Sequence, residues 1–212
     1  RRDRHRAGCG QPALHVAQDH AQGRADAVDT DRRQGTAGKQ QISYDRLIVS
    51  PDVDFVYDQL EGLRTAEAQH KMPHAWKAGE QTVQLRNQLM DLPAGGVVAM
   101  HIPKVPYRCP PGPYERASLI AYFLSLSKPK SKLLVFDANP EIQAKKDLFT
   151  HAWASRYKGI IEYVPNADIK SADAAKGVVN LDMHGAVKAD IWNVIPPQRA
   201  GAHHAAAFWL WR

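Results

Sequence analysis

Residues 95–137 read as a strand, a turn, a helix and a second strand. GGVVAMHIP at 95–103 is an apolar run of the length typical of a buried parallel strand, and KLLVFD at 132–137 has the same character. The residues between them that recur at helical spacing, and so share one helix face, are Ala117, Ile120, Ala121 and Leu124. Because parallel neighbours need such a crossover, this unit predicts an α/β fold on a parallel sheet.

Other elements are predicted on both sides of this unit. A helix is expected from Glu80 to about Pro93. Asn139-Pro140 has the pattern of a helix cap followed by a first turn, and Gly159 suits the end of that helix. One face of it would carry Phe149, Ala152, Trp153 and Tyr157. Short strands are predicted at 44–51, 160–165, 177–182 and 189–197, with 52–79 mostly irregular.

The two ends differ in composition from the middle. Residues 1–41 contain no Ile, Phe, Met, Trp or Tyr and show no period, so they cannot bury enough surface to offset their chain entropy. We therefore expect a disordered segment at 1–41. The tail at 202–212, AHHAAAFWLWR, also breaks the pattern of what precedes it. Both ends resemble the product of an out-of-frame translation or a misplaced start.

The charge distribution argues against a nucleic-acid-binding protein. Of the 28 Lys and Arg residues, 8 lie in residues 1–41 against 5 acids, and 1 lies in the tail. The middle then holds 19 basic and 17 acidic residues, so the formal charge of +6 comes mostly from the ends. No nucleic-acid partner is expected.

Several other classes of protein and site are also disfavoured. No run of 18 apolar residues predicts a membrane span, and no apolar segment follows the basic start as in a signal peptide. Two cysteines, Cys9 and Cys109, do not make a disulfide framework. No metal site is expected, because His203 and His204 have no further ligands at metal spacing.

The turn of the 95–137 unit is unlike a dinucleotide-binding turn. Such a turn has the pattern GxGxxG, and an acid at the end of the next strand binds the ribose. Here the turn is PKVPYRCPPGPYE, in which Gly112 is the one glycine. The unit is therefore not expected to bind NAD, and Asp137 is read as a strand-end or helix-entry residue in preference to a ribose ligand.

Cys109 lies in this turn, directly before the predicted helix. Prolines at 110, 111 and 113 restrict the backbone, and Pro113 suits a first helical turn. Free N–H groups at a helix N-terminus and the charge of Arg108 favour a thiolate, which is the reactive form. A small buried residue packed under the loop is an equally weighted interpretation.

Four stretches closely resemble the flavoprotein subunit of flavocytochrome c sulfide dehydrogenase. They are YDRLIVSPDVDF at 44–55, KMPHAWKAGEQT at 71–82, YRCPPGPYERASLIAYFLSLSKPKSKLLVFDA at 107–138 and VIPPQRAG at 194–201. The resemblance covers about residues 42–201, and the cysteine–proline turn is its most specific part. That family belongs, with sulfide:quinone reductases, to the flavoproteins with two dinucleotide-binding folds.

The resemblance implies both a fold and a function. The fold would be an incomplete Rossmann-like FAD/NAD(P)-binding α/β fold. In the family, sulfide gives electrons through a redox-active cysteine pair to FAD, and a haem-bearing cytochrome c subunit accepts them in the periplasm. Cys109 would match one member of that pair, so it is the candidate catalytic residue. The strand ending at Ser50 and Pro51 would abut the FAD, which makes these two the candidate cofactor-binding residues.

The chain also departs from the family pattern. The GxGxxG that binds FAD lies upstream of residue 42 in the family, the partner cysteine lies beyond residue 201, and Asp52 stands where glycine is usual. We therefore expect the end of an FAD-binding domain at 42–94 and a degenerate NAD-type domain at 95–201. Alone, this chain is expected not to oxidise sulfide. The alternative is a non-catalytic α/β module, a pseudoenzyme or a mis-called reading frame, that binds no flavin.

Overall fold

The structure, a computed structural model, describes residues 25–48 and 52–201. These residues divide into two units, 25–48 and 52–201. The larger unit is built on a parallel sheet of four strands in the order β11-β5-β6-β7. The strands are β11 (Ile191–Val194), β5 (Val97–Ile102), β6 (Lys132–Asp137) and β7 (Ile161–Val164). The α/β class and the strands predicted at 95–103 and 132–137 are confirmed.

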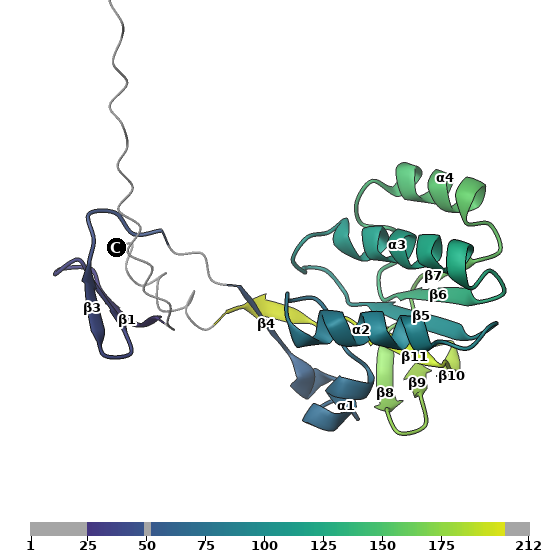
Figure 1. The fold of residues 1–212 in the computed structure, drawn as a ribbon, viewed down its shortest axis with the longest axis horizontal. Coiled ribbons are helices and arrows are strands. Elements are labelled where there is room, and N and C mark those ends of the chain that lie inside the picture. Colours follow the sequence, from purple (N-terminus) through teal and green to yellow (C-terminus); the bar gives the residue numbers. More distant parts are fainter. Residues whose placement is uncertain (1–24, 49–51, 202–212) are drawn as a thin grey trace, which may run out of the picture. The chain divides into compact units, whose positions relative to one another are not determined.

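Three helices cover one face of this sheet (Figure 1). They are α2 (Glu80–Asp91), α3 (Gly112–Ser127) and α4 (Lys146–Arg156). The four residues predicted for the inner face of α3 are all buried in this core. Leu85 of α2 is buried beside them, whereas Val83 and Met90 of α2 are exposed.

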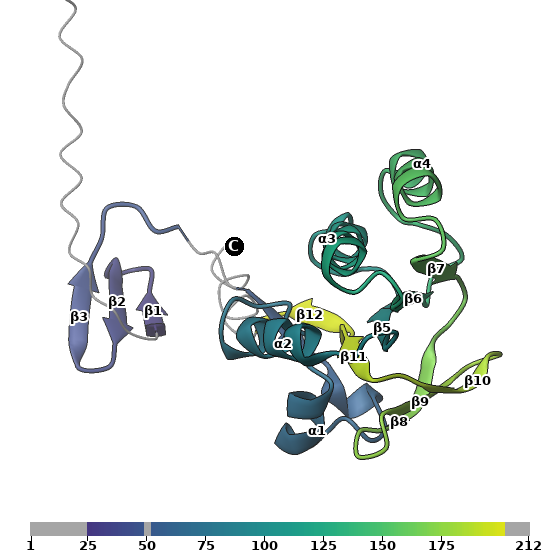
Figure 2. The ribbon, with the colours of Figure 1, turned by 45° about the vertical axis from the view of Figure 1, so that its right-hand side comes forward.

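A second layer covers the opposite face of the sheet, as Figure 2 shows. It contains an antiparallel sheet of β8 (Ile169–Asp173), β9 (Val178–Leu181) and β10 (Gly185–Lys188), together with α1 (Ala66–Lys71). Side chains of successive strand residues point to opposite faces. Accordingly Val98 and Met100 of β5 enter the helix-side core, while Ala99 enters the second core.

Two short elements complete the larger unit. β4 (Val53–Phe55) pairs antiparallel with β12 (Gln198–Ala200), and a 3-10 turn, η1 (Tyr57–Gln59), follows β4. The pairing joins segments that lie at opposite ends of this unit in the sequence.

The smaller unit corrects the expectation of disorder at 1–41. Residues 1–24 lie outside the described part of the chain, but the rest of that range forms strands. β1 (Ala25–Asp29), β2 (Gln34–Ala37) and β3 (Gln40–Ser43) make an antiparallel meander. None of its residues whose burial is described is buried. These strands are therefore held by backbone hydrogen bonds and by a tight turn at Gly38, which has φ +60°. The sequence has no apolar period that would have predicted them.

Two further local predictions are wrong. The described part of the strand expected at 44–51, residues 44–48, has no strand pairing, and Ile48 is 91% exposed, because the apolar run finds no partner strand there. Asn139 does not cap a helix, since α4 begins only at Lys146. Its amide is used instead by the loop that follows β5, as described below.

Candidate functional site

The cysteine turn connects β5 to α3 and begins at the carboxyl end of the sheet strand, as predicted. Cys109 is exposed, which rules out the interpretation as a buried packing residue. Its backbone is left-handed, with φ +60°, a conformation that costs a non-glycine residue energy. The N–H of Gly112, the first residue of α3, donates to the Cys109 carbonyl oxygen at 2.9 Å. Pro113 is the second residue of that helix.

The loop leading to the turn is fixed by Asn139. The side-chain oxygen of Asn139 accepts from the N–H of Val105 at 3.0 Å, and its nitrogen donates to the carbonyl of Pro103 at 3.0 Å. Asn139 is buried, so these bonds replace water. Further along, the hydroxyls of Tyr107 and Tyr114 lie 3.4 Å apart. The loop therefore reaches Cys109 from a backbone that is held at both ends.

Arg108 does not act as the free positive charge that the sequence suggested. Its guanidinium is paired with Asp52 and also donates to the carbonyl of Trp76 at 3.1 Å. Although partial burial opposes the shift, a hydrogen bond from Val53 N–H and the charge of Arg108 lower the pKa of Asp52. The backbone N–H of Arg108 donates to the side-chain oxygen of Gln198 at 2.9 Å. Arg108 thus ties the turn to β4 and β12.

The segment 73–76 lies against the turn without belonging to any helix or strand. Its residues are buried, and side chains satisfy its backbone. Asn193 donates to the carbonyls of Pro73 and His74 at 2.7 and 2.9 Å. Gln81 accepts from the N–H groups of His74 and Ala75 at 2.8 and 3.2 Å. The N–H of Trp76 donates to His74 Nδ1 at 2.7 Å. Burial and the charges of Arg116 and Lys77 lower the pKa of His74 to about 4, so Nδ1 is unprotonated at neutral pH and can accept this bond.

Arg116 of α3 connects this segment to the helix. It donates to the carbonyl of His74 at 2.7 Å, to that of Ala75, and to the side-chain oxygen of Asn193 at 3.1 Å. Its guanidinium carbon lies 4.9 Å from the ring centroid of Trp76. None of these partners is a carboxylate. Burial lowers the pKa of Arg116 to about 10, which still leaves it charged at neutral pH.

Gly112 marks a close approach between Trp76 and the thiol. A Cβ atom at Gly112 would lie 2.9 Å from the Trp76 ring and 3.2 Å from Cys109 Sγ. Both distances are shorter than ordinary contacts, so a side chain at this position would displace the ring or the sulfur. The indole and the thiol therefore flank one small gap beside the helix start.

Asp137 is fully occupied by the protein itself. It accepts from the hydroxyls of Tyr114 and Tyr163 at 2.8 and 2.9 Å, and from the backbone and side-chain nitrogens of Asn139 at 2.9 and 2.7 Å. Burial raises its pKa above the ordinary value. The carboxylate is buried and has no capacity left for a ribose, so the interpretation of Asp137 as a structural strand-end residue is confirmed.

His101 of β5 is a buried titratable residue close to the same sheet edge. It is 1% exposed, and neither ring nitrogen has a hydrogen-bond partner among the described residues. Burial lowers its pKa to about 4, against the opposing charge of Asp168, whose oxygen lies 3.9 Å from Nε2. Lys104 also pairs with Asp168, at 3.1 Å.

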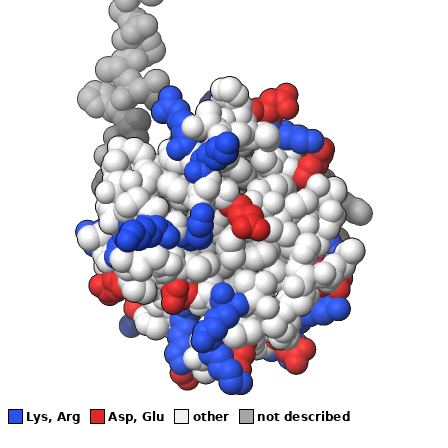
Figure 3. All heavy atoms as spheres, turned by 90° about the vertical axis from the view of Figure 1, so that its right-hand side faces the viewer, with Lys and Arg blue, Asp and Glu red and all other residues white. Residues whose placement is uncertain are grey.

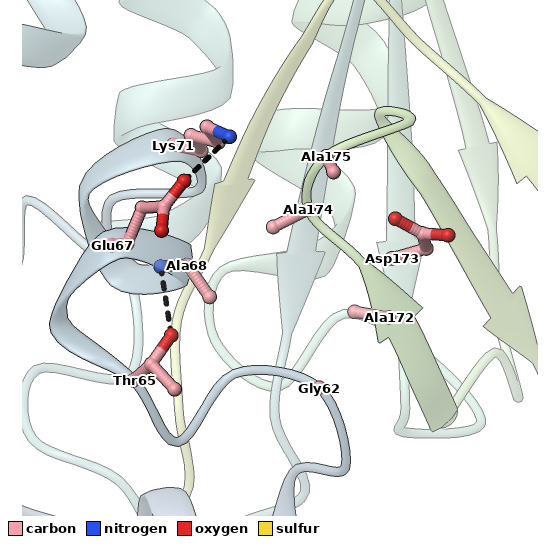
Figure 4. A pocket seen from close by; sticks show the side chains of 9 residues that line it. All are labelled: Gly62, Thr65, Glu67, Ala68, Lys71, Ala172, Asp173, Ala174 and Ala175. Carbon is pink, nitrogen blue, oxygen red and sulfur yellow. Dashed lines mark hydrogen bonds and ion pairs between the residues drawn. The ribbon is translucent and has the colours of Figure 1, made fainter.

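A pocket of about 330 Å³ lies elsewhere in this unit, between α1 and the end of β8 (Figure 4). It is lined by Gly62, Thr65, Glu67, Ala68, Lys71 and residues 172–175. Its charged groups are already paired, Lys71 with Glu67 and Asp173 with Lys176, at 2.9 and 2.7 Å. No residue of the cysteine turn reaches it.

Two other kinds of site were sought in the part of the chain that the structure describes. Among the residues that the structure describes, no group of three or more His, Cys, Asp or Glu could hold a metal ion. No helix in the described ranges is both long and apolar enough to cross a membrane. On the face in Figure 3, basic and acidic side chains are mixed.

A family model described as sulfide dehydrogenase (flavocytochrome c) flavoprotein chain, central, matches residues 82–196, more than half of the chain. The chain belongs to this family. The matched region includes α2 from its third residue onward, the cysteine turn, Asp137 and the whole parallel sheet.

Solved structures agree with this assignment at the level of fold. The sulfide:quinone oxidoreductase from Aquifex aeolicus aligns with 87% of this chain and 44% of its own, at 23% identity and a TM-score of 0.57. The NAD-dependent persulfide reductase from A. fulgidus covers 86% of this chain and 32% of its own, at 11% identity and a TM-score of 0.60. A pyridine nucleotide-disulfide family oxidoreductase from Enterococcus faecalis covers 84% of this chain and 38% of its own, at 14% identity and a TM-score of 0.55. This chain of the flavoprotein family thus spans less than half the length of each.

The predicted site residues are only partly placed. Ser50 and Pro51 lie outside the described residues, so their contact with a flavin stays a prediction. Cys109 lies where the sequence placed it, in the turn before α3, and its catalytic role stays a prediction. Sequence reasoning missed Arg116, Asn193 and Gln81. The residues that they contact lie 6 to 120 positions away in the sequence.

Proposed function

We propose that this chain carries the cysteine turn of a flavin-dependent sulfide dehydrogenase. Electrons would pass from sulfide through a cysteine pair and FAD to a cytochrome c subunit, in the periplasm, as the family resemblance implies. The observation that carries the proposal is that Cys109 is exposed at the point where the four resembled stretches meet. Arg108, the neighbour of the cysteine, belongs to one of these stretches. It bonds to one residue of each of the other three: Asp52, Trp76 and Gln198.

The chemistry proposed for Cys109 is thiol–disulfide exchange with sulfide. The sulfide sulfur attacks one sulfur of the cysteine pair and forms a new S–S bond, giving a persulfide. The bond between the two cysteines breaks, and the other cysteine leaves as a thiolate that holds the electron pair. Cys109 is one member of this pair, and the start of the 16-residue helix α3 favours negative charge beside it. The second cysteine is not among the described residues.

The local donors suit a flavin. Trp76 Nε1 and Gln198 Nε2 are buried N–H donors without a partner among the described residues, and both residues belong to the segments tied to the cysteine turn. A buried donor left unpaired is costly, so such groups indicate a missing acceptor. The ring oxygens and nitrogens of FAD are acceptors of this kind, and bound FAD would supply the two-electron acceptor. These two residues, with Ser50 and Pro51, are the proposed contacts.

The proposal can be tested on the thiol alone. Both cysteines are converted to mixed disulfides with a small aromatic thiol, sulfide is added without oxygen, and mass spectrometry follows the gain of one sulfur atom at each. We expect Cys109 to gain sulfur faster than Cys9, and Cys109→Ser to lose the fast phase. Equal rates at the two cysteines would contradict a specialised turn.

A second candidate is the non-catalytic α/β module. It is favoured by Asp137, which tyrosines and an asparagine occupy where a dinucleotide-binding unit would use a free acid. Flavin absorbance distinguishes the two functions. The chain is incubated with FAD and passed through a gel-filtration column. Flavin that elutes with the protein supports the sulfide dehydrogenase over the module.

A further inference from the structure

The segment 73–76 has a conformation that only side chains support. Every carbonyl from Pro73 to Trp76 accepts a hydrogen bond from Asn193, Arg116 or Arg108. Ala75 has φ +46°, a region that a non-glycine residue rarely adopts. Since no strand or helix fixes this backbone, removing one of these side chains leaves buried carbonyls unpaired and releases the conformation.

Arg116 makes the largest share of these contacts and is the least replaceable. Its planar fork binds two consecutive carbonyls and the Asn193 amide, while its flat face covers the Trp76 ring. A lysine would keep the charge but presents a single ammonium group and cannot reproduce this geometry. Because the hydrogen-bond partners of Arg116 are neutral oxygens, this partly buried cation does not complete an ion pair. Its contacts instead fix the position of the segment 73–76.

The residue that Arg116 holds is a wall of the cysteine site. The edge of the Trp76 ring and Cys109 Sγ meet at Gly112, where a single added carbon would be within 2.9 Å of the ring and 3.2 Å of the sulfur. Trp76 itself is 8% exposed. The indole therefore closes one side of the exposed thiol to an approaching reagent or substrate.

We propose that Arg116 is a positioning residue that fixes Trp76 as a wall beside Cys109 and so favours small sulfur nucleophiles over bulky thiols. The inference rests on the proposed function in taking Cys109 as the reacting thiol. It adds a selection by size that is built from α3 and the segment 73–76, which no motif in the sequence assigns.

The test measures size discrimination at one thiol. In the full chain with Cys9→Ser, second-order rate constants for Cys109 are measured with iodoacetamide and with a bulky aromatic disulfide. We expect Trp76→Ala and Arg116→Lys each to raise the bulky-to-small ratio of rate constants by about fivefold. Because they act on one wall, the double variant should show no further increase. Arg86→Lys, an exposed change on α2, should leave the ratio unaltered.

The outcomes separate positioning from stability and from the proposed function. A purely structural Arg116 would lower the melting temperature of Arg116→Lys but leave the ratio in the folded protein unchanged, which would overturn the proposal. If that variant does not fold, Trp76→Phe against Trp76→Ala decides, and equal ratios in these two and the parent overturn it. A wall that is confirmed while Cys109 gains no sulfur from sulfide would sink the proposed function alone.

Discussion

At the scale of single residues, Cys109 combines an exposed thiol with a left-handed backbone. Its φ of +60° places Cβ close to the following carbonyl, at a cost of about 1–2 kcal/mol for a residue other than glycine. The surrounding turn, with its prolines and the bonds of Arg108, holds this conformation. Removing Cβ by substitution with glycine relieves this steric cost, so the substitution should change the free energy of unfolding by a measurable amount.

We predict that Cys109→Gly is more stable than Cys109→Ala by about 1 kcal/mol. Glycine adopts a positive φ without strain, whereas alanine keeps the steric cost of Cβ. The free energy of unfolding in urea measures the difference. Leu119, exposed in the middle of α3, is the matched control, and there glycine should be about 1 kcal/mol less stable than alanine. The same order at both positions would refute the strain at Cys109.

The buried histidine His101 predicts loss of stability in acid. Its folded-state pKa of about 4 lies below the ordinary 6.5 because burial penalises the charged form. The neutral form therefore stabilises the fold above pH 6.5, and up to roughly 3 kcal/mol is lost as the pH falls through 4. His101→Leu should flatten this decline. His74, with a similar pKa, should keep part of it.

The measurement for His101 is the free energy of unfolding between pH 4 and 8. His151→Leu, at an exposed position on α4, is the control and should leave the acid decline unchanged. An acid decline as steep in His101→Leu as in the parent chain would show that the buried imidazole does not set the pH dependence.

At the scale of elements, the layers are joined by a few close backbone approaches. Residues 61 and 171 form an isolated parallel bridge, and the N–H of Ala172 donates to the carbonyl of Glu61 at 2.8 Å. This bridge attaches the segment before α1 to β8. Gly62, with φ +85°, stands in it, and a Cβ there would lie 1.8 Å from the Ala172 carbonyl oxygen.

We predict that Gly62→Ala destabilises the fold much more than Gly185→Ala. Both glycines have a positive φ, +85° and +74°, so both substitutions carry a backbone cost of about 1–2 kcal/mol. No atom lies within 4 Å of an added Cβ at Gly185, whereas Gly62 adds a clash with backbone. The extra loss should be at least about 2 kcal/mol. Thermal and urea unfolding of the two variants check this, and equal losses would mean that the bridge opens freely.

The elements that the sequence predicted well are those with a continuous apolar signal. β5, β6 and α3 have it because both faces of a parallel strand and the inner face of a crossover helix are buried. β8 and β10 were missed, since IKSAD and GAVK alternate weakly and gain their order from pairing. α1 was missed because it has only six residues. The strand expected at 44–48 shows the converse error, an apolar run with no partner.

The sequence predicted where the candidate site lies, but not the side-chain contacts that hold the segment 73–76 beside it. The strand–turn–helix pattern located Cys109 at the sheet edge before a helix start, and the prolines indicated a rigid turn. The contacts of Arg116 and Asn193 with the segment 73–76 depend on three-dimensional pairing between residues 41 to 120 positions apart. Local sequence propensity contains no information on such distant pairs. It therefore cannot predict which side chains hydrogen-bond to an irregular backbone segment.

At the scale of the whole molecule, the hydrophobic core belongs to one of the two units. The buried hydrophobic residues run from Val56 to Ile195, and none is found among residues 27–48. Burial of apolar surface is the main favourable term in folding. The meander β1–β3 therefore contributes little to the cooperative stability of the unit formed by residues 52–201.

We predict that a chain of residues 52–201 unfolds in urea with the same midpoint as residues 1–212. Among the removed residues whose burial is described, 27–48, none buries a large side chain. The surface exposed in the main transition should therefore be nearly unchanged, and the slope should also be preserved. Circular dichroism and tryptophan fluorescence both follow the transition. A lower midpoint for the shorter chain would show that the meander stabilises the larger unit.

The segment 73–76 has a consequence for how this sequence can change over generations. Its backbone is satisfied by side chains at 81, 108, 116 and 193, so a substitution at one of these positions alters what the others can tolerate. Selection would act on them as a set. Descendants that lose the arginine at 116 should also show altered residues at 75 and 193, and crosses between diverged versions should fail when these positions come from different parents.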